Sequence, residues 1–163
     1  MDRCTVALDQ LTGRANEDGE LDVDWLFFLA QSMVNCAALV SKLLWTSEKN
    51  TFALERSKHL RDVLAVSDDS ILKSRAVRNH VEHFDDRLDK AVQAPPHILV
   101  DRIVGPEERA VRIEGMPSTR FLRRIEPETM TFSVLDDGVS LPGLGEAMRA
   151  LTSEARLQLT MVD

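Results

Sequence analysis

The sequence contains no tyrosine, only two cysteines and fewer basic than acidic residues. Cys4 and Cys36 lie far apart and match no metal or redox spacing, which predicts two free thiols in a reducing cytosol. The 20 Lys and Arg against 27 Asp and Glu give a net charge of −7. Because phosphate contacts need clustered Lys and Arg, this balance argues against broad nonspecific nucleic-acid binding, although it leaves room for a small local basic site.

Long uninterrupted apolar runs are also absent. In the most apolar segment, Asp22 to about Ser47, polar residues intervene before any run reaches the roughly 18 apolar residues of a membrane span. The N-terminus lacks the pattern of a secretion signal, so we expect a cytoplasmic protein and a buried helix over this segment. Such a helix needs neighbours on several sides, in a bundle or at a dimer interface. Its polar residues form one narrow stripe: Asp24, Gln31, Asn35, Lys42 and Lys49.

Two further helices are predicted before residue 94. Asn50 and Thr51 can cap a helix to about Val66. Its expected inner face is Phe52, Leu60, Val63 and Leu64. The next helix should begin at residues 67–70, where capping residues and negative charge gather, and end before Ala94-Pro95-Pro96, because a residue before proline is pushed out of helical geometry. The two prolines mark the predicted domain boundary.

After the prolines the pattern changes from helical to alternating. Met130, Phe132 and Val134 alternate with polar residues, as in a half-buried strand. Further strands are predicted at 98–104, 110–114 and 120–125, and the short connections between them favour an antiparallel meander. After the turn at 136–138, a last helix over about 144–159 should present four side chains to the body: Met148, Leu151, Ala155 and Leu159.

The predicted fold class is therefore α+β. Residues 1–94 are expected to form a helical bundle, and residues 95–163 a small antiparallel β-meander with a C-terminal helix, packed on the bundle.

The third predicted helix carries a polar motif. Its core stripe consists of Val77, Val81, Phe84 and Leu88. Arg78, Asn79 and His83 lie on the arc that points away from this stripe, so they must face solvent, another subunit or a ligand.

The order Arg78-Asn79-x-x-x-His83 resembles the signature of the HEPN superfamily, with the resemblance covering about residues 20 to 94. It implies a helical bundle and a metal-independent endoribonuclease, without cofactor, whose active site forms between two subunits of a homodimer. His83 would then be the base and Arg78 would hold the charge on phosphorus. Arg75, His80 and Arg87 are predicted to contact the RNA substrate, and Arg120, Arg123 and Arg124 to add phosphate contacts.

One position departs from part of that superfamily. In HEPN toxins paired with a nucleotidyltransferase antitoxin, a tyrosine two residues after the histidine is modified by the partner. Here Asp85 occupies that position and the chain has no tyrosine, which excludes this form of regulation.

Three alternatives remain open from the sequence. Arg78 with Glu82 and His83 with Arg87 are spaced as on a solvated charged helix face. His80 and His83 lie one turn apart near acidic residues, but their spacing matches neither zinc-protease pattern and there is no third ligand in sight. Finally, the motif helix could serve as a non-catalytic surface for dimerisation or for an unknown protein partner.

Overall fold

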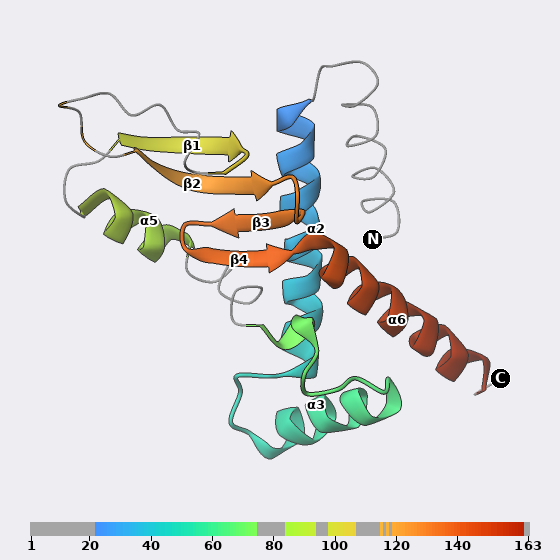
Figure 1. The fold of residues 1–163 in the computed structure, drawn as a ribbon. Coiled ribbons are helices and arrows are strands. Elements are labelled where there is room, and N and C mark those ends of the chain that lie inside the picture. Colours follow the sequence, from blue (N-terminus) through green and yellow to red (C-terminus); the bar gives the residue numbers. More distant parts are fainter. Residues whose placement is uncertain are drawn as a thin grey trace.

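The computed structural model describes residues 22–74, 84–93, 98–106, 115, 117 and 119–161. Figure 1 shows the arrangement of the elements in this part of the chain. They are, in order, α2 (Val23–Leu44), α3 (Thr51–Val63), the 3₁₀ helix η1 (Ile71–Lys73), α5 (Phe84–Gln93), β1 (Ile98–Val104), β2 (Thr119–Glu126), β3 (Thr131–Val134), β4 (Asp137–Ser140) and α6 (Leu141–Thr160).

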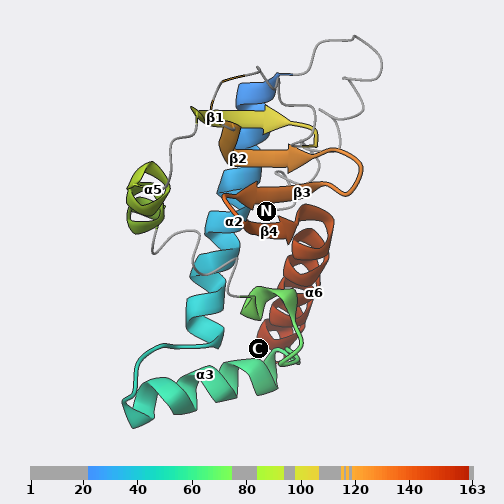
Figure 2. The same ribbon diagram turned by 60° about the vertical axis from the view of Figure 1, so that its left-hand side comes forward.

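The long helix α2 is the element on which the others pack. Asp22 caps its first turn by accepting a hydrogen bond from the backbone N–H of Trp25 at 2.9 Å. The sheet lies across the N-terminal half of α2, and α3 crosses its C-terminal end (Figures 1 and 2). One face of α2 is therefore buried along its length, and ten residues are buried: Leu26, Phe27, Leu29, Ala30, Met33, Val34, Ala37, Ala38, Ser41 and Leu44.

The sheet has the order β1-β2-β3-β4 and is mixed. β1 and β2 run parallel, with Arg102 opposite Arg123, whereas β2–β3 and β3–β4 are antiparallel. The predicted antiparallel meander is therefore wrong in its first pair. The connection over residues 105–118 explains the difference, because a parallel crossover needs about a dozen residues and this connection supplies them. The strand predicted at 110–114 lies outside the described residues.

The hydrophobic core forms between α2 and the sheet. The ring of Phe27 meets the ring of Phe132 edge to face, with centroids 6.1 Å apart. Ile125 and Val134 complete the sheet side, and Leu144 at the start of α6 closes the core. α6 follows β4 directly because Ser140 caps it, accepting from the backbone N–H of Gly143 at 3.2 Å.

The predicted helical bundle over residues 1–94 is wrong. α2 packs on the sheet, and α3 runs across the end of α2 instead of alongside it (Figure 2). The side chains of α3 explain this, since only Ala53 and Ser57 are buried and the expected inner-face residue Phe52 is 74% exposed. In the described segments the sheet and the helices therefore form an α+β fold. The four α-helices there, α2, α3, α5 and α6, do not form an obvious bundle.

Several element bounds were predicted well. α2 lies within the apolar segment predicted from Asp22, α3 begins at its predicted cap Asn50, and α5 ends at Gln93 before the prolines. β1, β2 and β3 match predicted strands. The helix expected from residues 67–70 onward is wrong at its start, because only the short η1 forms there and it ends at Lys73, followed by Ser74 with a non-helical ψ of 134°. The sequence pattern predicts a turn at Asp137 and Gly138, because both are common turn residues, whereas in the structure they begin β4. Leu159 was one of the four α6 side chains predicted to face the body, and this prediction is wrong, because Leu159 is 70% exposed.

Candidate functional site

The predicted catalytic residues Arg78, Asn79 and His83 lie outside the described residues, as do Arg75 and His80. Arg87 belongs to α5, but its side chain is also outside the described part. The structure therefore describes the two segments that flank the motif. These are the chain through η1, which ends at Ser74, and the helix α5, which begins directly after His83.

A polar cluster holds the segment that leads into the motif. Asp68 accepts hydrogen bonds from the indole Nε1 of Trp45 at 3.0 Å and from Nζ of Lys73 at 3.1 Å. The Nε of Arg61 lies 3.7 Å from the same carboxylate, and its guanidinium lies over the Trp45 ring. These contacts lower the pKa of Asp68, mainly through the Trp45 hydrogen bond and then through Lys73.

This cluster has a structural role. It joins the C-terminal end of α2, the helix α3 and the segment before η1. The guanidinium of Arg61 also donates to the backbone carbonyls of Leu44 and Ser57, and Leu72 of η1 is buried in the core. The segment that ends at Ser74 is consequently held against the body of the protein.

The helix α5 begins immediately after His83. Asp85 and Asp86 occupy its first turn, where negative charge interacts favourably with the helix dipole. Both side chains are exposed, whereas Ala91 is buried. Seen in Figure 2, α5 stands to one side of α2 and the sheet. The acidic first turn thus follows the predicted base directly in the chain.

The arginines of the sheet are already paired with carboxylates. Arg123 donates from Nε and Nη2 to Asp101 at 2.7–2.9 Å, and Arg120 donates to Asp136 at 2.8 Å. Arg102 pairs with Asp24 and Asp101. A phosphate would have to displace these carboxylates. The prediction that Arg120 and Arg123 add phosphate contacts therefore finds no support in this geometry.

Two of these arginines have a clear packing role instead. The guanidinium carbons of Arg102 and Arg123 lie 5.8 and 5.9 Å from the ring centroid of Phe27, which is 1% exposed. Their planar cations cover an aromatic ring at the border of the core. The sequence pattern could not reveal this, because it depends on the parallel register that places Arg102 opposite Arg123.

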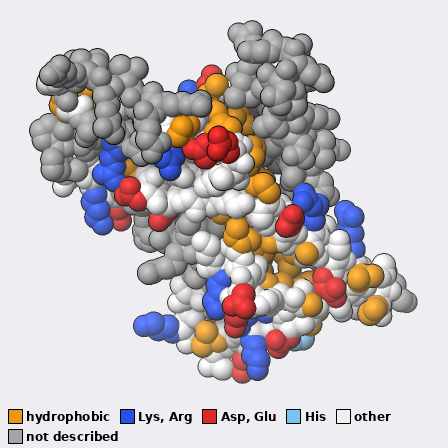
Figure 3. Space-filling model, viewed as in Figure 1, with side chains coloured by type: hydrophobic (Ala, Val, Ile, Leu, Met, Phe, Trp, Pro, Cys, Tyr) orange, Lys and Arg blue, Asp and Glu red, His pale blue; other side chains and the backbone are white. Residues whose placement is uncertain are grey.

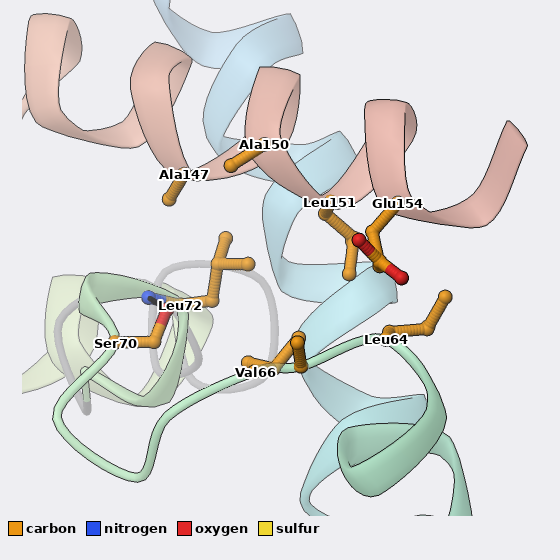
Figure 4. A pocket seen from close by; sticks show the side chains of 9 residues that line it. Leu64, Val66, Ser70, Leu72, Ala147, Ala150, Leu151 and Glu154 are labelled. Atoms are coloured by element: carbon orange, nitrogen blue, oxygen red, sulfur yellow. Dashed lines mark hydrogen bonds between the residues drawn. The ribbon is translucent and has the colours of Figure 1, made fainter. Parts of the chain in front are cut away.

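A groove of about 250 Å³ separates α6 from the chain between α3 and η1 (Figure 4). Its walls are mainly aliphatic, with Leu72 and Val66 on one side and Ala147 and Leu151 on the other. Among the described residues that line it, Glu154 alone is ionisable, and its carboxylate accepts a hydrogen bond from Gln158. These described lining residues include no nucleophile paired with a base. Nor do three His, Cys, Asp or Glu side chains gather as a metal site anywhere in the described segments.

The remaining unusual surface is an apolar stripe on α2. Trp25, Phe28, Leu39 and Leu43 are 45–61% exposed, and the rings of Trp25 and Phe28 stack with centroids 5.1 Å apart. The narrow polar stripe predicted for this helix is therefore incomplete, since the exposed sector also contains these large apolar side chains. Their spacing of three and four residues was the signal that could have identified them.

α2 is also long and apolar enough to cross a membrane, by length and composition alone. The core helix of a soluble protein and a signal sequence pass the same test. In this structure one face of α2 is occupied by the sheet and the other elements of the core.

No protein-family model, curated protein or solved structure matches this chain.

Proposed function

We propose that this protein is a metal-independent endoribonuclease that acts as a homodimer in the cytoplasm. The observation that carries the proposal is the motif Arg78-Asn79-x-x-x-His83, which resembles the HEPN signature. In support, the described chain before the motif reaches Ser74 on a segment held by the Asp68 cluster, and α5 begins directly after His83.

The chemistry follows from the histidine and the arginine of the motif. Neutral imidazole of His83 takes the proton from a ribose 2′-hydroxyl, because its ordinary pKa near 6.5 keeps it available at neutral pH. The 2′-oxygen attacks phosphorus, the bond to the 5′-oxygen breaks, and a proton passes to that leaving oxygen. The products carry 2′,3′-cyclic phosphate and 5′-hydroxyl ends. Arg78 stabilises the extra negative charge on the phosphate oxygens through a bidentate fork.

The other residues of the motif region have supporting roles. Asn79 can hydrogen-bond to His83 or orient the substrate, and Arg75, His80 and Arg87 contact the RNA backbone or bases. Because Arg102, Arg120 and Arg123 are paired with carboxylates, the positive charge for RNA comes from the motif region in this proposal.

Cleavage of RNA in excess EDTA tests the proposal. The wild type should cleave, and His83→Ala and Arg78→Ala should each lose about 100-fold or more of the rate, because a positioned base and a charge-stabilising donor each contribute on that order. His59→Ala is the matched control, since His59 is an exposed histidine of α3. Cleavage that needs a metal, or that survives His83→Ala, would contradict the mechanism.

A second function is favoured by a separate observation. The exposed apolar stripe of α2 is typical of a protein–protein contact surface, which supports a non-catalytic dimerisation or interaction module. A folded, dimeric wild type that cleaves no RNA would favour this second function over the nuclease.

A further inference from the structure

The apolar stripe of α2 has a symmetric layout. We define it as Trp25, Phe28, Ser32, Cys36, Leu39 and Leu43, which follow one another at intervals of three and four residues on one side of the helix. It runs for about 27 Å at 1.5 Å per residue. Large side chains stand at both ends, and the small residues Ser32 and Cys36 stand in the middle. Figure 3 shows hydrophobic side chains, in orange, gathered at several places on one face of the molecule.

A second copy that runs antiparallel fits this layout. With a two-fold axis midway between Ser32 and Cys36, Trp25 of one copy meets Leu43 of the other, and Ser32 meets Cys36. The small residues then coincide at the centre, where two helices approach most closely, while each aromatic end packs on the leucines of the partner. A C₂ interface requires this match of one surface with itself.

The charges beside the stripe fit the same arrangement. Asp24 and Lys42 lie on one side of α2, near opposite ends, with Gln31 and Asn35 between them. In the antiparallel pair Asp24 of each copy approaches Lys42 of the other. The Asp24 side chain stays 81% exposed while it pairs with Arg102, so it is accessible to a second cation. The two helix dipoles are also opposed, which is favourable.

From these observations we propose that two copies of this chain dimerise by antiparallel packing of the α2 stripe about a two-fold axis midway between Ser32 and Cys36. Trp25 and Phe28 are the anchors, because their stacked rings are a preformed aromatic pair of the kind that dominates interface energies. The proposal identifies the contact surface of the homodimer, and it does not depend on the nuclease chemistry.

Sedimentation equilibrium of the full chain tests the proposal without RNA. The wild type should be dimeric at micromolar concentration, and Phe28→Glu should raise the dissociation constant by about 100-fold or more, because two charges are introduced into one apolar interface. Leu39→Glu should do the same. Phe52→Glu is the matched control, since Phe52 is an exposed phenylalanine of α3. A circular dichroism spectrum shows that each variant is folded.

A wild type that stays monomeric to roughly 100 µM would overturn the proposal. A dimer that persists in both Phe28→Glu and Leu39→Glu would also overturn the proposal. If the monomeric wild type instead binds phosphatidylcholine vesicles and Phe28→Glu abolishes that binding, the stripe contacts a membrane and the dimer is wrong.

Cross-linking distinguishes the antiparallel register from a parallel one. In a Cys4→Ser background the two Cys36 residues are offset by about 6 Å along the helix axis, so a short bismaleimide should join them. In a second variant, Leu43→Cys with both native cysteines replaced by serine, the two thiols are separated by about 27 Å along the antiparallel pair and should not react together, whereas a parallel pair would place them side by side. Efficient cross-linking through position 43 would overturn the antiparallel register.

Discussion

Asp68 is the residue whose charge matters most to the segment before the motif. Its carboxylate receives the Trp45 indole N–H and the Lys73 ammonium, and these partners lower its pKa. Because the pKa in the folded protein lies below that in the unfolded chain, the carboxylate stabilises the fold above about pH 4. This stabilisation is lost as the pH falls through the lowered pKa.

Asp68→Asn should therefore reduce the free energy of unfolding at pH 7, and the difference from wild type should shrink toward zero as the pH falls through the lowered pKa. Urea denaturation at several pH values measures this, with the exposed neighbour Asp69→Asn as control. A difference that stays constant from pH 7 to the acid limit would show that Asp68 acts through its shape and not through its charge.

The C-terminus of α3 ends in a Schellman motif that lacks the usual glycine. Val66 donates to the carbonyl of Arg61 at 2.9 Å, and Ala65 donates to that of Asp62 at 3.3 Å. Ala65 sits at φ 48°, a left-handed conformation in which a β-carbon is strained. The turn therefore carries a cost that glycine would remove.

Ala65→Gly should stabilise the protein by about 0.5–1 kcal/mol, net of the extra freedom that glycine gives the unfolded chain. Ala150→Gly is the matched control on the exposed side of α6, and it should destabilise by about 1 kcal/mol. Thermal denaturation of both variants provides the comparison. A loss of stability in Ala65→Gly would show that the left-handed turn is unstrained.

An element could be predicted from the sequence when the residues that determine it are close together in the chain. α2 and α3 are encoded locally, by Asp22 and Asn50 at their caps, and both were predicted. The parallel pairing of β1 with β2 is set by contacts between distant residues, which no local pattern reports. The pairing of the arginines also depends on contacts between distant residues. The sequence pattern predicts a phosphate contact for Arg123, whereas the fold places Asp101 against it as an ion-pair partner. The motif at Arg78 and His83 stays a prediction.

At the scale of the whole molecule, the core contains residues from both sides of the predicted boundary at the prolines. Phe27 of α2 contacts Phe132 of β3, and Leu72 and Leu144 belong to the same cluster. Neither side encloses this core alone, because the apolar face of α2 is covered by the sheet. The chain should therefore unfold in one cooperative transition, whatever the functional division of its residues.

Phe132→Leu tests this cooperativity. Removing part of a fully buried ring in the sheet should lower the free energy of unfolding by about 1–2 kcal/mol.

Both tryptophans, Trp25 and Trp45, lie in or directly after α2, so their fluorescence reports on the helical half of the chain. The urea midpoint from fluorescence should fall by as much as the midpoint from far-ultraviolet circular dichroism, at one fixed protein concentration. Phe52→Leu, at an exposed position, should move neither midpoint. A fluorescence midpoint that stays at the wild-type value in Phe132→Leu would mean that α2 is stable without the sheet, and the chain would then consist of two independent units.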